Sequence, residues 1–172
     1  MTRPILAFAL AFAASALGAA PALAQKVELD TTAGRIVLQL DAAAAPKTVE
    51  NFVAYVKSGH YDGTQFHRVI PGFMAQTGDV KFGKQGGASF NPARAGMGGS
   101  DKPDLKAEFS NANHGRGACS MARSQNPNSA NSQFFIMFGD GSFLNGQYTV
   151  VGEVVSGMDA VDKIKKGDAN NN

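Results

Sequence analysis

An arginine lies inside a dense apolar run near the middle of the chain. Arg68 falls within the stretch FHRVIPGFMAQ (66–76), which also supplies two phenylalanines, a methionine and Gln76. A second stretch, SQFFI (132–136), again places an amide, Gln133, beside aromatic residues. This combination favours an apolar pocket with one fixed cationic donor, because a guanidinium stays protonated at any working pH. The alternative is a solvated arginine on the open face of a strand.

Other kinds of catalytic site find no support in the sequence. The three histidines, His60, His67 and His114, do not have metal-ligand spacing. Neither a G-x-S-x-G motif nor a phosphate-binding loop motif occurs. The single cysteine, Cys119, lies among small residues in GACSM (117–121), which favours a buried and inert thiol. A hydrolase, a metalloenzyme and a nucleotide-binding enzyme are therefore not predicted.

Length and charge narrow the class of protein further. The 172 residues fit one domain. With 16 basic and 14 acidic residues, the formal net charge is only +2, so we expect no nucleic-acid or anionic-membrane partner. One cysteine excludes an intramolecular disulfide and a cysteine-rich zinc site. The 20 glycines indicate many turns and loops.

The first 24 residues have the features of a secretory signal peptide. Arg3 is their one charge, an apolar run follows at 5–14, and Ala22-Leu23-Ala24 is an A-x-A cleavage pattern before Gln25. The run is short for a membrane anchor, which is the alternative interpretation. We therefore expect cleavage after Ala24 and export to the periplasm. The mature chain would be one domain over 25–172, with no membrane partner after cleavage.

Hydrophobic periodicity predicts a mostly β domain with two helices. Alternation over 27–29 and 36–40, around Thr32-Ala33-Gly34, predicts a hairpin. Pro46 opens a helical pattern that ends before Gly59. Further strands are expected at 66–70, 73–76, 117–122, 133–138 and 148–155, and a short helix at 158–164. A long glycine-rich loop is expected between Asp79 and Pro103.

Three long stretches of the chain resemble the cyclophilin family of peptidyl-prolyl isomerases. They are TVENFVAYVKSGHYDGTQFHRVIPGFMAQTGD (48–79), GACSMARSQNPNSANSQFFI (117–136) and FLNGQYTVVGEVVSGMDAVDKI (143–164). They occur in the family's order and at similar spacing, and the chain looks like the exported bacterial branch. The resemblance implies a cyclophilin-like antiparallel β-barrel with two helices. It also implies acceleration of X–Pro isomerisation in unfolded or newly exported proteins, without a cofactor or a metal.

The resemblance also assigns site residues. Arg68 would be catalytic, by donating a hydrogen bond to the prolyl nitrogen in an apolar groove. The residues implied to bind the substrate are His67, Phe73, Met74, Gln76, Ala122, Arg123, Gln133, Phe135, Phe143, Leu144 and Tyr148. Three of these depart from the common eukaryotic pattern. Phe143 occupies a position where that pattern has Trp, Tyr148 one where it has His, and Arg123 one where it has Asn. Without an indole N–H at position 143, we expect weak cyclosporin binding.

Two further expectations follow from the resemblance. Family members continue through a final strand that closes the barrel, whereas this chain ends at Asn170-Asn171-Asn172. We therefore expect the final barrel strand to be absent and an open edge beside Val27–Leu29. We expect a monomer that acts on proline-containing, unfolded or extended polypeptides. A non-enzymatic module that holds such segments in the same groove is the alternative function.

Overall fold

The first two strands form the hairpin that their alternating sequence predicts. The computed structural model describes residues 25–166, and in it β1 (Lys26–Thr31) pairs antiparallel with β2 (Gly34–Leu40). The turn is closed by Thr31, whose hydroxyl donates to the Gly34 carbonyl at 2.7 Å. Gly34 has a φ of 131°, and a Cβ there would lie 3.0 Å from the Ala160 Cβ, so the turn requires glycine.

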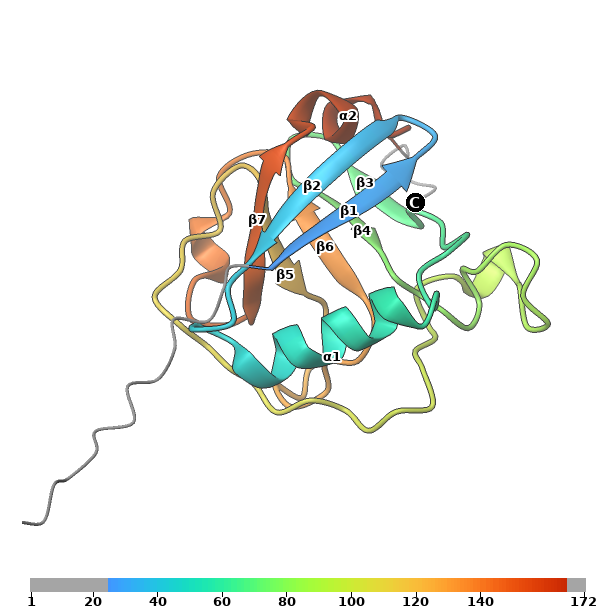
Figure 1. Ribbon diagram of the computed structural model, residues 1–172, viewed down its shortest axis with the longest axis horizontal. Helices are drawn as coiled ribbons and strands as arrows, with labels where there is room; N and C mark the ends of the chain where they lie inside the picture. Colours follow the sequence, from blue (N-terminus) through green and yellow to red (C-terminus); the bar gives the residue numbers. More distant parts are fainter. Residues whose placement is uncertain (1–24, 167–172) are drawn as a thin grey trace, which may run out of the picture.

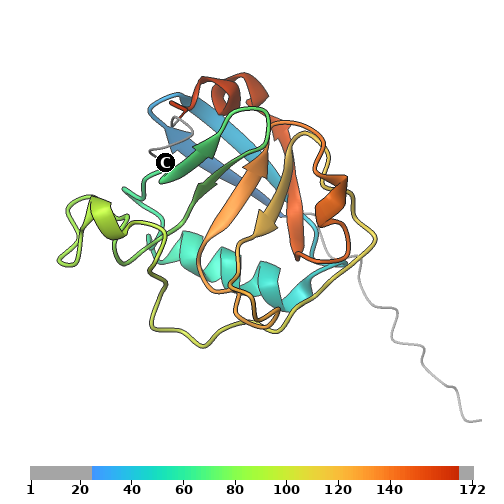
Figure 2. The same ribbon diagram turned by 180° about the vertical axis from the view of Figure 1, so that it is seen from behind.

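Seven antiparallel strands form one curled sheet, which confirms the predicted mostly β fold. The remaining strands are β3 (Arg68–Ile70), β4 (Met74–Thr77), β5 (Ala118–Met121), β6 (Phe134–Met137) and β7 (Val150–Ser156). Their order is β1-β2-β7-β5-β6-β4-β3, so within residues 25–166 the sheet has β1 and β3 as its edges. Irregular pairing at Val37/Leu38 and at Cys119/Ser120 adds to the curl. Figures 1 and 2 show β1 and β2 on one side of this half-barrel and β3, β4 and β6 on the other.

Two helices cover the ends of the curled sheet (Figure 1). The longer helix α1 (Pro46–Lys57) turns Val49, Phe52 and Tyr55 inward. Its first turn is capped by Glu108, which accepts from the Thr48 N–H at 2.8 Å and from the Thr48 hydroxyl at 2.7 Å. A carboxylate at a helix N-terminus stabilises the exposed N–H groups and the helix dipole. Because this cap comes from 60 residues along the chain, the sequence pattern alone did not reveal it.

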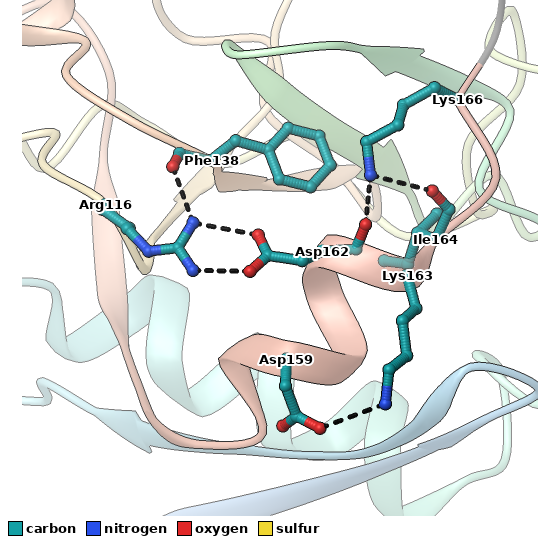
Figure 3. A network of polar contacts seen from close by, with 7 residues as sticks. All are labelled: Arg116, Phe138, Asp159, Asp162, Lys163, Ile164 and Lys166. Atoms are coloured by element: carbon teal, nitrogen blue, oxygen red, sulfur yellow. Dashed lines mark hydrogen bonds and ion pairs between the residues drawn. The ribbon is translucent and has the colours of Figure 1, made fainter.

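The short helix α2 (Met158–Lys163) is fixed by an ion pair with Arg116 (Figure 3). Arg116 donates to both carboxylate oxygens of Asp162, at 2.9 and 2.7 Å, and to the Phe138 carbonyl at 2.9 Å. The Arg116 guanidinium lowers the pKa of Asp162. Lys166 lies over the Phe138 ring, 4.8 Å from its centroid, and also bonds the Asp162 carbonyl. We name this group, Arg116, Phe138, Asp162 and Lys166, the helix clamp.

Residues of β5 and β6 point alternately into two apolar clusters. Cys119, Phe134 and Ile136 lie in the main core inside the curl, while Phe135 and Met137 lie in a second cluster on its outer face. Successive side chains of a strand point to opposite faces, so these central strands are buried on both sides. The predicted burial of Cys119 is confirmed, and this burial raises the pKa of its thiol. The second cluster contains several of the predicted apolar site residues.

Some of the other predictions from the sequence lie outside the described residues, and others can be compared with the structure. The predicted signal peptide (1–24) and the terminal asparagines lie outside the described residues. Within 25–166, none of the helices has the length and apolar character needed to cross a membrane. The predicted loop after Asp79 is confirmed apart from one short turn, η1 (Pro92–Arg94), while η2 (Ser142–Leu144) was not predicted.

Candidate functional site

Most of the predicted apolar site residues form one cluster on the outer face of the sheet. Met74 and Phe135 are buried and form its floor, next to Ala118 and Met137. The partly buried members around this floor are Ile70, Phe73, Ala122, Leu144 and Tyr148. These residues come from β3, β4, β5, β6, η2 and the segments beside them. The fold thus brings together parts of the chain that are far apart in the sequence, and we call this region the groove.

Aromatic rings line the rim of the groove. Phe143 on η2 is 63% exposed, and its ring centroid lies 5.6 Å from that of Phe73. Tyr148 meets Phe135 edge to face, with centroids 5.8 Å apart. Such a rim combines accessible apolar surface with fixed ring orientation, which suits the binding of a small apolar ring.

Arg68 stands at the edge of the groove with few partners in the protein. It is exposed at the start of β3 and faces Gln76 across the β3–β4 pair. Its one hydrogen bond among the described residues runs from Nη1 to Gln76 Oε1 at 3.4 Å, and no carboxylate pairs with it there. A guanidinium has five N–H donors, so most of them are left for a bound molecule or solvent.

Two amides orient Arg68 through a continuous chain of hydrogen bonds. Gln76 Nε2 donates to Gln133 Oε1 at 2.9 Å. Gln133 Nε2 in turn donates to the carbonyls of Gly96 and Gly98, at 2.9 and 2.6 Å. Because the loop carbonyls can only accept, they fix which end of the Gln133 amide points to Gln76, and hence which end of Gln76 faces Arg68. We call Arg68, Gln76 and Gln133 the amide chain.

Asp79 holds the glycine-rich loop that ends this chain. Its carboxylate is buried and accepts four main-chain N–H bonds, from Lys81, Phe82, Gly96 and Gly98, at 2.7 to 3.0 Å. Burial alone would raise the pKa of Asp79, but the four donors outweigh it and lower the pKa. A Cβ at Gly98 would lie 2.5 Å from Asp79 Oδ1, so this close approach requires glycine. Sequence reasoning located the loop but missed Asp79 as its anchor.

His67 packs beneath the same loop. Neither ring nitrogen has a hydrogen-bond partner among the described residues, and a Cβ at Gly96 would lie 2.9 Å from His67 Cδ2. Burial lowers the pKa of His67, so the ring is neutral at neutral pH. It therefore adds no second charge beside Arg68. Its predicted contact with substrate stays a prediction.

His114 supports the floor of the groove, a role that sequence reasoning missed. Its ring is buried and stacks on Phe135, with centroids 6.3 Å apart. Nδ1 lies 3.0 Å from Asn145 Oδ1, and Nε2 lies 3.1 Å from the Ser120 hydroxyl. Burial lowers the pKa of His114. Its partners are up to 31 residues away, so spacing along the chain gave no signal.

Arg123 uses its guanidinium within the protein. Nε and Nη2 donate to the Gln147 carbonyl at 3.0 and 2.8 Å, and the guanidinium lies 4.5 Å from the centroid of the Tyr148 ring. The adjacent main-chain N–H of Ala122 donates to the Gln133 carbonyl at 2.9 Å. A cavity of about 430 Å³ adjoins the groove here and is lined by Gln76, Met97, Arg123 and Gln133, among others.

The arrangement offers a charged donor beside an apolar pocket. Within residues 25–166, no group of three or more His, Cys, Asp or Glu side chains is placed to bind a metal ion. The groove residues are suited to act by shape and by hydrogen bonding. Such a site can bind an apolar ring and stabilise a polar atom that develops a lone pair beside it.

Comparison with known proteins identifies the family. The family model described as "Cyclophilin type peptidyl-prolyl cis-trans isomerase/CLD" matches residues 26–172. A "Probable peptidyl-prolyl cis-trans isomerase" of Brucella suis biovar 1 (strain 1330) is 66% identical over 134 residues, which are 78% of this chain and 68% of the relative. The isomerase cyp18 of Streptomyces antibioticus is 46% identical over 147 residues, covering 81% of this chain and 82% of the relative.

Solved structures agree with these sequence relatives. A Cryptosporidium parvum cyclophilin-type isomerase, crystallised in the presence of the dipeptide Ala-Pro, has a TM-score of 0.72 and 30% identity. The match covers 86% of this chain and 90% of that structure. Together with the shared curled sheet, these matches show that the chain belongs to the cyclophilin-type family and is a peptidyl-prolyl cis–trans isomerase.

Proposed function

We propose that the chain accelerates rotation about X–Pro bonds by directing an N–H of Arg68 at the prolyl nitrogen of a proline held in the groove. The observation that carries this proposal is the position of Arg68. It lies at the edge of an apolar cluster, it is oriented by Gln76, and most of its donors are unused within the described residues.

The chemistry of the bond explains why a single donor suffices. Conjugation in the amide sets a rotation barrier of about 18–20 kcal/mol, and uncatalysed isomerisation takes roughly 10–100 s. Twisting breaks the conjugation and returns a lone pair to the prolyl nitrogen. A donor aimed at that nitrogen stabilises the twisted state more than either planar state, which is the condition for catalysis. The step needs neither a nucleophile nor proton transfer.

The other predicted residues have roles that follow from their positions. Phe73, Met74, Phe135 and Leu144 hold the proline ring, since they line the apolar cluster. Gln76 bonds the substrate backbone while it orients Arg68. The Cryptosporidium relative was crystallised in the presence of Ala-Pro, which supports a proline-binding role for this fold. The rest of the proposed substrate-binding set surrounds these residues and comprises His67, Ala122, Arg123, Gln133, Phe143 and Tyr148.

The physiological substrates we propose are unfolded or newly exported proteins in the periplasm. Support comes from the sequence of residues 1–24, with its apolar run and the A-x-A pattern before Gln25. Fractionation of cells that express the tagged full-length chain tests this proposal. We expect a periplasmic product that begins at Gln25, and an uncleaved cytoplasmic protein would contradict it.

Substitution of Arg68 tests the mechanism. We expect Arg68→Ala to lower kcat/KM by at least about a hundredfold, or about 2.7 kcal/mol, with the fold intact. Arg68→Lys keeps the charge but lacks the planar fork, so we expect an intermediate loss. A protease-coupled assay on a cis-proline peptide measures both, with circular dichroism and thermal melting as checks on folding. Near-normal activity of the alanine variant would exclude the proposed mechanism.

A holding function in the same groove is a second candidate. Phe143 and Met97 are 63% and 74% exposed, which leaves apolar surface at two sides of the groove. Suppression of aggregation of an unfolded test protein distinguishes the two functions. If suppression survives Arg68→Ala while isomerisation is lost, the groove also holds extended segments without catalysis.

A further inference from the structure

We propose that Arg123 is a positioning residue for the isomerase. It holds one wall of the groove, the segment Phe143–Tyr148, in the conformation that binds substrate. We call this segment the groove wall. The inference rests on the proposed groove, because the groove wall carries Phe143, Leu144 and Tyr148, three of its proposed substrate contacts.

The guanidinium of Arg123 joins two loops. Nε and Nη2 both donate to the Gln147 carbonyl, at 3.0 and 2.8 Å. Nη1 donates to the Ser124 carbonyl at 2.9 Å, on the loop that follows β5. The group also lies over the Tyr148 ring, 4.5 Å from its centroid. One planar, forked cation makes all these contacts, and a lysine ammonium could not reproduce them.

The groove wall is held from its inner side as well. Asn145 Oδ1 accepts from the main-chain N–H of His114 at 2.9 Å and lies 3.0 Å from its Nδ1. Within the wall, Gln147 Nε2 donates to the Phe143 carbonyl at 2.8 Å. The inner anchor therefore fixes the middle of the wall, while Arg123 fixes the end that carries Tyr148.

Tyr148 depends on this outer support. Its ring meets Phe135 edge to face at 5.8 Å and is half-buried, so one side is covered by the groove floor and the cation covers another. None of the five ion pairs among residues 25–166 involves Arg123. The Arg123 guanidinium thus contacts main-chain carbonyl oxygens and the Tyr148 ring.

This arrangement predicts a distinct kinetic signature. Arg123 contacts the groove wall and makes no contact with Arg68, so its loss should weaken substrate binding equally in the planar and twisted states. Uniform loss of binding raises KM and leaves kcat nearly unchanged. We expect Arg123→Gln to raise KM by about fivefold with kcat within about twofold of the parent. A residue needed only for global stability would not produce this split in the folded enzyme.

A double-mutant cycle between Arg123 and Tyr148 tests the coupling. Tyr148→Leu removes the ring, and we expect Arg123→Gln to have little further effect on KM in that background. Tyr148→Phe retains the ring, so there Arg123→Gln should still raise KM. We expect Arg123→Lys to resemble Arg123→Gln, because a point charge lacks the fork. Independent, multiplying effects, or full activity of the lysine variant, would overturn the inference.

Hydrogen exchange measured by mass spectrometry supplies a readout that does not depend on activity. We expect faster exchange in peptides spanning 142–149 of Arg123→Gln, with the α1 peptides unchanged. The matched control is Arg94→Gln, because the Arg94 guanidinium lies 4.0 Å from the centroid of the Phe82 ring, on the glycine-rich loop. The control should change neither KM nor exchange at 142–149. Unchanged exchange there in Arg123→Gln would contradict the inference.

The outcomes separate this inference from the function on which it rests. If Tyr148→Leu leaves KM unchanged, the groove assignment itself fails at this wall. If Tyr148→Leu raises KM but Arg123→Gln does not, the groove stands and the positioning role is excluded.

Discussion

Two arginines of the domain, Arg116 and Arg68, have contrasting surroundings. In the helix clamp, Arg116 donates to both oxygens of Asp162 and to the Phe138 carbonyl, and so fixes α2 (Figure 3). At the groove, Arg68 makes one long hydrogen bond among the described residues, to Gln76. A guanidinium whose donors are satisfied by the fold stabilises structure. One whose donors are left open can serve a bound substrate.

The neighbours of each arginine decide whether its guanidinium stabilises the fold or stays available to a substrate. The Arg116 partner is a carboxylate, and the bidentate geometry engages both Nη atoms of the guanidinium. The Arg68 partner is an amide, which orients the guanidinium without neutralising it. The nearby carboxylate of Asp79 is already bound by four main-chain N–H groups, and His67 is neutral because burial lowers its pKa. Among residues 25–166, the groove therefore keeps the Arg68 charge without a carboxylate partner.

The difference between the two arginines would disappear if Arg68 also had a carboxylate partner. Gln76→Glu places one opposite its guanidinium and should make Arg68 resemble Arg116. We expect kcat/KM to fall by about thirtyfold, because Arg68 then donates to the introduced carboxylate instead of the prolyl nitrogen. The protease-coupled assay measures this, and Gln76→Ala separates loss of orientation from charge pairing. Full activity of Gln76→Glu would contradict the importance of an unpaired guanidinium.

Removing the charge of Asp79 tests what keeps the amide chain ordered. We expect Asp79→Asn to lower the free energy of unfolding by about 1.5–3 kcal/mol near pH 7, since charge-assisted bonds from four N–H groups are lost or weakened. The folded-state pKa of Asp79 is lowered, so its stabilisation is complete above the ordinary value of about 3.9 and is lost as pH falls through the lowered pKa. Urea denaturation across pH measures the difference between the two proteins. A difference independent of pH would refute this account.

The helix clamp provides the reciprocal test. We expect Arg116→Gln to lower the melting temperature measurably and to leave kcat/KM within about twofold of the parent, because its partners lie on α2 and just after β6 and not in the groove. Calorimetry and the isomerase assay measure the two effects. A large loss of activity in a folded Arg116→Gln protein would show that the two regions are not independent.

The smallest expected effect concerns the affinity of the groove for cyclosporin. Phe143 is largely exposed on the rim and lacks a donor. We expect weak cyclosporin binding by the parent protein and an increase of about threefold or more for Phe143→Trp, whose indole N–H adds one hydrogen bond. Titration calorimetry measures both affinities. Equal affinity would count against the placement of Phe143 at the groove.

Much of the fold was predictable because its signals are local. The alternation around Thr32-Ala33-Gly34 predicts the first hairpin, and Pro46 and Gly59 bracket α1. The apolar runs predict β3 to β7 to within a few residues. The turn η2 was missed because its sequence, Ser142-Phe143-Leu144, has no helical period. Short turns of this kind are decided by what packs around them.

The sequence by itself determined the residue types of the site and their order along the chain. Arg68 in an apolar run and Gln133 beside two phenylalanines are local facts, and the resemblance they support led to the correct family. Only the tertiary structure decided how they connect. The amide chain, the Asp79 anchor, the His114 support and the Arg123 contacts each include a hydrogen bond between residues 8 to 57 positions apart, with no repeating spacing. Hydrogen bonds of this kind depend on which strands pair and which loops meet, and that is set by packing of the whole domain.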